Sequence, residues 1–249
     1  MSSEEIPLKA ISHIGEANRC ARFFSVRNDG SYERVKNHFG FIPYEVPDPG
    51  FFVGLNTEYE RPYEKEYIII QIADDKPEKR YGSIESRTRF IQNLKVVIRQ
   101  LSKKYHIILA PHVYDDVKIS EEIIYGISNC SIWNFSLFAF DHIHNAIAYY
   151  KYAKFVIAMR GHGQIIPMSF SVPAIALCNH PKHRGLMKKI NLEEYAIDVV
   201  DKSFVEKLDV LISKIENNYY NFINTLSIRN KEFYDITSNA FGIIKKNIQ

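Results

Sequence analysis

The chain has 249 residues, of which 46% are hydrophobic and 24% are charged, and its formal net charge is +3. These values are close to the averages for ordinary globular proteins, which excludes the disordered and fibrous classes. Basic residues are interleaved with acidic ones and form no block, so we expect no nucleic-acid-binding surface. The longest apolar runs are far shorter than the roughly 20 residues of a transmembrane helix, and we expect no membrane span.

The N-terminus and the cysteines indicate the cellular compartment. The first residues, Met-Ser-Ser-Glu-Glu, lack the basic start and the apolar stretch of a secretory signal. Cys20, Cys130 and Cys178 are far apart in the chain and form no CxxC pair. This spacing is typical of reduced structural thiols, so we expect a cytoplasmic protein without a zinc site.

Short apolar runs alternate along the chain with segments of helical periodicity. Most of the runs are apolar on both faces, as buried parallel strands are. Strand and helix in regular alternation predict an α/β fold with a doubly wound, Rossmann-like parallel sheet. The expected strands are Arg22–Val26, Tyr67–Ala73, His106–Ala110, Phe155–Met159, Ala174–Cys178 and Ala196–Val200.

The helices are predicted from apolar residues that recur on one helical face. Beyond Asp201 this spacing predicts one or two long C-terminal helices that pack across the sheet. We expect a single domain over residues 1–249, with its globular part at about 20–200 and the C-terminal helices at 201–249. The apolar stripes between strands are Ile91, Leu94, Ile98 and Leu101, and Ile143, Ala146, Ile147 and Tyr150.

The segment after the first predicted strand holds a helix and then a long connection. Ser31 is expected to cap a helix that runs to Phe39, with Gly40 as its C′ residue. Residues Ile42–Lys65 are rich in Pro, Glu, Gly and Tyr and lack periodicity. We therefore predict a long connection that reaches the edge of a functional site.

Polar residues follow five of the predicted strands. In an open parallel sheet, ligands bind beyond the carboxyl ends of the strands, so these residues are expected to meet at one edge. They are Arg27–Ser31, Asp74–Lys76, His112 with Asp115 and Asp116, Arg160–Gly163, and Asn179–Lys182.

The segment Met159–Ser169 gives the clearest functional signal. Arg160 ends a buried strand, Gly161 and Gly163 let the backbone approach a ligand, and His162 starts a helix. An arginine holds phosphate or carboxylate through two hydrogen bonds, and a histidine transfers protons near neutral pH. The segment therefore predicts an anion-binding site, without specifying a substrate.

Each candidate residue also has a purely structural interpretation. Arg27 is alternatively the partner of Asp29 in a surface ion pair, and His162 is alternatively a packing residue. His112 with two nearby carboxylates is a weak indication of metal binding. Two carboxylates in a loop after a strand are more typical of caps and solvated surface, so we interpret Asp115 and Asp116 in this way and expect no metal.

Several segments resemble, in order, the polysaccharide pyruvyltransferase family. The most specific are RGHGQIIPMSFSVPAIAL, which starts at Arg160, and the following NHPKHRGL. FFSVRNDGSYERV, VPDPGFF and IILAPHVYDD resemble further segments of the same half of the family's proteins. The similarity runs from about Phe23 to Asp198. Gly161 stands where many members carry a leucine, which marks a subfamily.

The resemblance implies a fold similar to one half of a GT-B glycosyltransferase, in which two Rossmann-like domains face a cleft. It also implies transfer of the enolpyruvyl unit of phosphoenolpyruvate to two sugar hydroxyls, which gives a pyruvate ketal and free phosphate. The expected partners are phosphoenolpyruvate and a saccharide of a cell-surface polysaccharide or its lipid-linked precursor. No further cofactor is implied, and a lipid-linked acceptor would bring the protein to the inner membrane.

Roles for individual residues follow from the same resemblance. Arg27 and Arg160 are expected to clamp the phosphate and carboxylate of the donor, and His162 is expected to protonate its methylene carbon. His180 and Lys182 match a second polar cluster that steadies the departing phosphate. The expected substrate-binding set is completed by Ser31, Gly161, Gly163 and His112.

Two other functions stay open from the sequence. The chain is alternatively a glycosyltransferase-like half that binds a nucleotide sugar through the same helix N-terminus. It is alternatively a catalytically silent binding module, since the family's proteins are usually longer and contain a second Rossmann-like half. An isolated half exposes the ends of its cleft-facing strands, which predicts association with a partner domain or a homo-oligomer.

Overall fold

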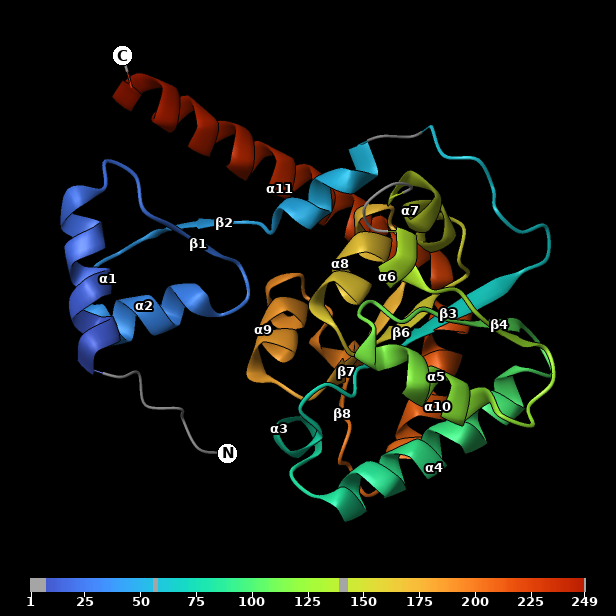
Figure 1. Cartoon of the computed structure of the whole chain (residues 1–249). Helices are drawn as coiled ribbons and strands as arrows, with labels where there is room; N and C mark the ends of the chain where they lie inside the picture. Colours follow the sequence, from blue (N-terminus) through green and yellow to red (C-terminus); the bar gives the residue numbers. More distant parts are fainter. Residues whose placement is uncertain (1–7, 56–57, 139–142, 249) are drawn as a thin grey trace.

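A six-stranded parallel sheet forms the centre of the protein, as the computed structural model of residues 8–55, 58–138 and 143–248 shows (Figure 1). Its strand order is β5-β4-β3-β6-β7-β8, and every neighbouring pair is parallel. The predicted doubly wound α/β fold is thus confirmed. The strands are β3 (Tyr67–Gln71), β4 (His106–Leu109), β5 (Cys130–Ile132), β6 (Val156–Ala158), β7 (Ala174–Cys178) and β8 (Ala196–Asp198).

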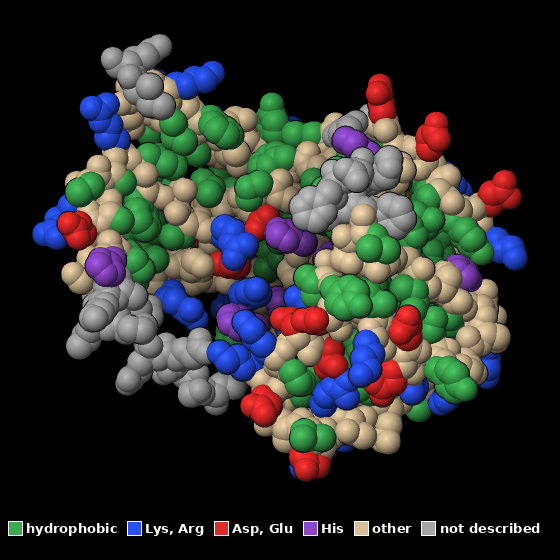
Figure 2. Space-filling model, viewed as in Figure 1, with side chains coloured by type: hydrophobic (Ala, Val, Ile, Leu, Met, Phe, Trp, Pro, Cys, Tyr) green, Lys and Arg blue, Asp and Glu red, His purple; other side chains and the backbone are tan. Residues whose placement is uncertain are grey.

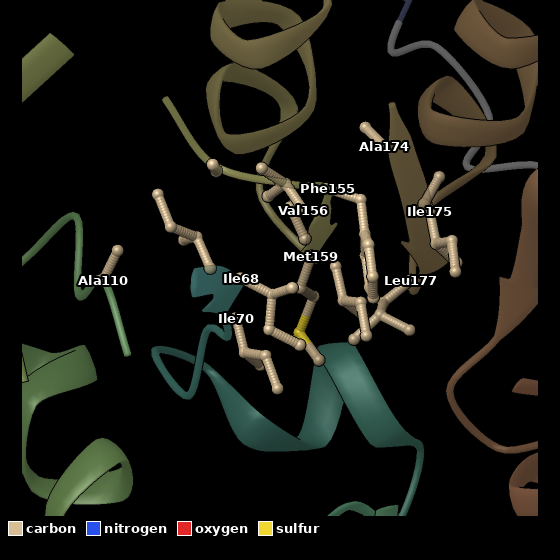
Figure 3. Packing of buried hydrophobic residues seen from close by; sticks show 14 of the residues in the cluster. Ile68, Ile70, Ala110, Phe155, Val156, Met159, Ala174, Ile175 and Leu177 are labelled. Carbon is tan, nitrogen blue, oxygen red and sulfur yellow. The ribbon is translucent and has the colours of Figure 1, made fainter. Parts of the chain in front are cut away.

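The central strands are buried along their whole length because helices cover both faces of the sheet. Every residue of β3, β6 and β7 is buried. Figure 3 shows Ile68, Ile70, Phe155, Met159 and Leu177 packed together in this core. Burial on both faces explains why these strands are apolar at successive positions and do not alternate.

The helices between the strands bury the apolar stripes that the sequence indicates, except for Ile143, which is exposed at the start of α7. Leu94 and Ile98 of α4 and Ala146 and Tyr150 of α7 are fully buried. The helices of this part are α3 (Pro77–Tyr81), α4 (Ile84–Leu101), α5 (Asp115–Ile124), α6 (Phe135–Phe138), α7 (Ile143–Lys151), α8 (Gly161–Ser169) and α9 (Pro181–Lys189), with the short 3₁₀ helix η2 (Glu193–Tyr195).

The first predicted strand does not join the main sheet. It lies at β1 (Ser25–Arg27) and pairs in parallel with β2 (Tyr44–Val46) in a separate two-stranded sheet. Helices α1 (Leu8–Cys20) and α2 (Ser31–Phe39) accompany this pair at one side of the molecule (Figure 1). The expectation that this segment belongs to the central sheet was therefore wrong. Two of the three residues of β1 are exposed, whereas every residue of β3 in the central sheet is buried.

Helix α2 begins differently from the prediction. Ser31 is its first helical residue, and the N-cap is Gly30, whose φ of 92° lies in the left-handed region. Asp29 takes the capping role, because its Oδ1 accepts hydrogen bonds from the backbone N–H (3.2 Å) and the hydroxyl (2.5 Å) of Ser31. Gly40 ends the helix as predicted, with a φ of 69° that favours glycine.

The connection predicted over Ile42–Lys65 contains more structure than expected. Besides β2 it holds the 3₁₀ helix η1 (Pro49–Leu55), which packs against α8. The approach is very close at Gly54, where an added Cβ would lie 1.9 Å from the carbonyl oxygen of Ser169. At the other end of η1, Gly50 lies close to Ile165 and His162, so the start of η1 lies beside the first turns of α8.

Two long helices end the chain, as predicted. Helix α10 (Phe204–Asn217) packs against α4, and α11 (Tyr219–Ile248) follows directly. Phe222 and Leu226 anchor the first half of α11 in the core. Its second half extends to the unit that contains β1 and β2 (Figure 1), where Arg22 Nη1 donates a hydrogen bond to the carbonyl of Asn247 (2.5 Å). Helix α11 therefore links the two sheets.

All three cysteines, Cys20, Cys130 and Cys178, are free thiols, as the sequence predicts. Within residues 8–55, 58–138 and 143–248, no helix combines the length and the apolarity that crossing a bilayer requires.

The contact between η1 and α8 predicts the effect of one added methyl group. Gly54→Ala should lower the free energy of unfolding by about 1–3 kcal/mol, because the backbone of Ser169 leaves no room for a Cβ. Urea unfolding followed by circular dichroism measures this change. Gly242→Ala is the matched control: nothing lies within 4 Å of its added Cβ, so this variant should be as stable as the wild type or slightly more stable.

Candidate active site

A cleft of about 740 Å³ lies between the unit of β1 and β2 and the carboxyl ends of the main-sheet strands. All five polar strand ends that the sequence singled out contribute to its lining, together with the start of η1. Figure 2 shows Lys, Arg and His side chains gathered around the hollow between the two units. Polar and charged residues of the lining include Arg27, Asp48, His112, Arg160, His162 and Lys182.

Positive charge exceeds negative charge in this cleft. Among the described residues that line it, six are lysines or arginines and three are carboxylates. A cleft lined by an excess of one sign of charge attracts ligands of the opposite sign, so this cleft favours anions. The six cations are Arg27, Lys76, Lys79, Arg80, Arg160 and Lys182, and the three carboxylates are Asp29, Asp48 and Asp75.

Arg160 lies between β6 and α8 and is held by several hydrogen bonds. Its backbone N–H donates to Gln71 Oε1 (2.7 Å). Its guanidinium donates through Nε and Nη2 to the two carboxylate oxygens of Asp116, at 2.7 Å each, and Nη2 also pairs with Asp75. The N–H groups of Nη1 have no partner among the described residues, so this edge of the guanidinium is the one left to bind a ligand.

Asp116 is the buried partner that fixes Arg160. Its side chain has no exposed surface, and its oxygens also accept weak hydrogen bonds from the backbone N–H groups of Asp74 and His112 (3.3 Å each). A buried carboxylate is tolerated when it is paired and hydrogen-bonded in this way. The interpretation of Asp116 as solvated surface was therefore wrong, whereas Asp115 is exposed as expected.

The N-terminus of α8 offers unused backbone donors to the cleft. Arg160 is its N-cap, with an extended backbone and no side-chain capping bond. Among the described residues, nothing accepts a hydrogen bond from the N–H groups of Gly161, His162 or Gly163. The positive end of the helix dipole and these donors together favour an anion.

The two glycines of this segment have different roles. Gly161 lines the cleft, and an added Cβ would meet nothing within 4 Å. Gly163 is buried outside the lining, where an added Cβ would lie 3.1 Å from both Gln71 Oε1 and Ala158 Cβ. The structure therefore places Gly161 at the surface of the cleft, whereas Gly163 packs against Gln71 and Ala158.

His162 projects into the cleft from the first turn of α8, with 60% of its side chain exposed. Its Nε2 lies 3.5 Å from Oδ1 of Asp48, whose side chain is only 7% exposed. Asp48 also accepts hydrogen bonds from Arg27 Nη1 (2.8 Å) and from the backbone N–H of Gly50 (2.9 Å). The contact with His162 is the largest of the effects that outweigh burial and hold the pKa of Asp48 well below its usual range.

Arg27 faces α8 from the end of β1. It forms ion pairs with Asp48 and with Asp29 (3.1 Å), so the predicted surface pair with Asp29 is present. Half of the Arg27 side chain is nevertheless exposed. The exposed part of its guanidinium lies in the lining of the cleft, where a ligand can reach it.

His112 is a neutral member of the lining. Its Nε2 is 2.6 Å from the hydroxyl of Tyr150, and its ring stacks on Phe135 with 4.6 Å between centroids. Burial, reinforced by the positive charges of Arg160 and His162, lowers the pKa of His112 to about 3. At neutral pH it therefore serves as an uncharged hydrogen-bonding group.

The remaining predicted residues are divided between the cleft and its surroundings. His180 caps α9, accepting a hydrogen bond from the backbone N–H of Lys182 (3.2 Å), and both residues line the cleft. Ser31 lies outside the lining, and its hydroxyl donates to Asp29. Within the described part of the chain, no three His, Cys, Asp or Glu side chains are arranged to hold a metal ion.

Four polar residues organise the site in ways that the sequence did not predict. Asp48 lies in the VPDPGFF segment and Asp75 is one of the polar residues that follow β3, but neither was given a role of its own. Gln71 is the last residue of β3. It is fully buried, and its Oε1 accepts a hydrogen bond from the backbone N–H of Arg160. Asp116 was noted but misinterpreted. Each of these roles depends on a partner distant in sequence.

The Arg160–Asp116 pair predicts a large effect on stability. Arg160→Ala should lower the free energy of unfolding by about 3–5 kcal/mol, because it leaves a fully buried carboxylate without its cation. Arg160→Leu combined with Asp116→Leu should recover most of this loss, since no unpaired charge remains. Urea unfolding of the three proteins tests the idea, and a single variant as stable as the wild type would contradict it.

Burial of His112 predicts a pH-dependent stability. The pKa is about 3 in the folded protein and about 6.5 in an unfolded chain, so the unfolded state binds more protons between these values. The free energy of unfolding should therefore decrease as the pH falls from 6.5 towards 3. Between pH 7 and pH 5, the free energy of unfolding of His112→Gln should decrease by roughly 1–2 kcal/mol less than that of the wild type. Urea unfolding at the two pH values measures this difference. A variant with the wild-type pH dependence would contradict this.

One comparison with known proteins finds a match. A family model described as Polysaccharide pyruvyl transferase matches residues 11–181, which is more than half of the chain. The matched region runs from α1 to the first residue of α9 and contains Arg27, Asp48, Arg160 and His162. No curated protein matches the chain.

Proposed function

The chain belongs to the polysaccharide pyruvyl transferase family, and on this premise we propose that its cleft transfers a pyruvyl group from phosphoenolpyruvate to a saccharide. The family description indicates a transferase and suggests a polysaccharide acceptor. One observation supports phosphoenolpyruvate as the donor: Arg27, His162 and the free N–H groups of α8 meet in one cation-rich cleft. The proposal includes a cytoplasmic location, with a lipid-linked acceptor at the inner membrane.

The two anionic groups of the donor match two sets of hydrogen-bond donors. Phosphoenolpyruvate carries a carboxylate and a phosphate on one carbon, so it needs two anion sites close together. The first set is the N-terminus of α8 with the unpaired edge of Arg160. The second is Arg27, and Lys182 at the start of α9 adds positive charge to the same cleft.

In the proposed reaction, His162 acts as the acid. Its imidazolium gives a proton to the methylene carbon of the donor, which leaves a positively charged carbon next to the carboxylate. A sugar hydroxyl attacks this carbon, and its proton restores the imidazolium of His162. The bond between the carbon and the phosphate oxygen then breaks, a second sugar hydroxyl attacks the carbon to close the ketal, and its proton goes to the departing phosphate. Two hydroxyl protons are released, one to His162 and one to the phosphate, so atoms and charge balance.

The apolar part of the cleft lining is suited to a sugar, because the C–H faces of a sugar ring pack on such surfaces. Its residues are Val113, Phe135, Ile143, Ile147, Ile165 and Ile166. The neutral imidazole of His112 stacks on Phe135 beside it.

Titration calorimetry with phosphoenolpyruvate tests the proposal. The wild type should bind it, and Arg27→Ala should weaken binding at least about tenfold by removing a charged hydrogen-bond donor. His162→Gln should bind the donor but release phosphate at least about 100-fold more slowly when an acceptor glycan is present. Arg184→Ala, which breaks an exposed pair with Asp198 outside the cleft, is the matched control and should bind like the wild type.

Other results would point to other functions. Binding of a nucleotide sugar and no phosphoenolpyruvate would replace the proposal with a glycosyltransferase-like function. Binding of neither ligand would indicate a silent binding module.

A further inference from the structure

Asp48 contacts two basic side chains of the cleft that come from different parts of the fold. Arg27 lies at the end of β1 in the small sheet, and His162 lies in the first turn of α8 on the main sheet. The carboxylate of Asp48 is 2.8 Å from Arg27 Nη1 and 3.5 Å from His162 Nε2. A single carboxylate therefore joins the two units across the cleft.

The carboxylate is itself held in one orientation. Its Oδ1 accepts a hydrogen bond from the backbone N–H of Gly50 (2.9 Å), and the backbone N–H of Asp48 donates to Asn28 Oδ1 (3.3 Å). Only 7% of the side chain is exposed. Little freedom remains for the side chain to rotate away from its two partners.

Gly50 shows how closely this segment approaches α8. An added Cβ would lie 2.9 Å from Cγ2 of Ile165, 3.2 Å from Oδ1 of Asp48 and 3.4 Å from Cδ2 of His162. A side chain at position 50 would push η1 away from α8. The absence of a side chain here lets Asp48 reach His162.

We propose that Asp48 is a positioning residue, which fixes the imidazole of His162 and the guanidinium of Arg27 relative to one another at the reacting end of the cleft. His162 is largely exposed, so without this contact its ring would sample several rotamers. The inference rests on the proposed function for the reaction that His162 performs. The contact itself does not depend on that function.

Two aspartate variants separate this role from a general effect on Arg27. Asp29 also pairs with Arg27 but makes no contact with His162, which makes Asp29→Asn the matched comparison for Asp48→Asn. Asp48→Asn should lower kcat about 10- to 100-fold, because a misplaced reacting group costs this much. Asp29→Asn should change mainly the KM for phosphoenolpyruvate. Equal effects of both variants on kcat would overturn the proposal.

Gly50→Ala provides a second test that keeps the carboxylate. Because the methyl group displaces η1 from α8, this variant should reproduce the fall in kcat seen for Asp48→Asn. Urea unfolding identifies any variant that loses its fold. A folded Gly50→Ala protein with the wild-type kcat would overturn the proposal.

A spectroscopic measurement separates this inference from the proposed function. In protein labelled with ¹⁵N-histidine, His162→Gln identifies the ring signals of residue 162. Asp48→Asn should shift these signals and Asp29→Asn should leave them in place. Signals that do not respond to Asp48→Asn would overturn the positioning role, even if phosphoenolpyruvate is turned over. Signals that respond in a protein that does not bind phosphoenolpyruvate would support the contact and reject the proposed function.

Discussion

The ion pair between Arg160 and the fully buried Asp116 is the interaction on which the site depends. It fixes the residue that joins β6 to α8, and with it the direction in which the N-terminus of α8 points. Gln71 adds a hydrogen bond to the backbone of the same residue from the neighbouring strand. The free N–H groups of α8 are therefore preorganised before any ligand arrives, which is the condition for strong electrostatic binding.

Some charged groups of the cleft form ion pairs within the protein, whereas other donors remain available to a ligand. Asp75 and Asp116 neutralise most of the Arg160 guanidinium, and Asp48 is shared by Arg27 and His162. The unused edge of Arg160, the exposed half of Arg27 and the amides of α8 then face the open space. The residues that carry these free donors, Arg27, Arg160, Gly161 and His162, all line the same cleft.

Membership of the family gives this geometry a chemical interpretation. Phosphoenolpyruvate, the donor that we propose, carries two anionic groups and needs one proton donor, and Arg27, the N-terminus of α8 and His162 all line one cleft. The site is built from both units of the chain, since Arg27 and Asp48 come from the β1–β2 side and His162 from the main sheet. Helix α11, which contacts both units, therefore supports the site without lining it.

The sequence by itself determined the parallel sheet, the two long C-terminal helices and the meeting of four polar strand ends at one edge of this sheet. These features depend on local patterns, because apolar runs form buried strands and the ends of parallel strands all reach the same edge. Only the tertiary structure decided that β1 lies outside the main sheet, that Asp29 takes over the cap expected of Ser31, and that Asp116 is buried. It also decided that Asp48 joins Arg27 to His162. Such pairings arise between segments far apart in the chain, so no local pattern of residue types encodes them.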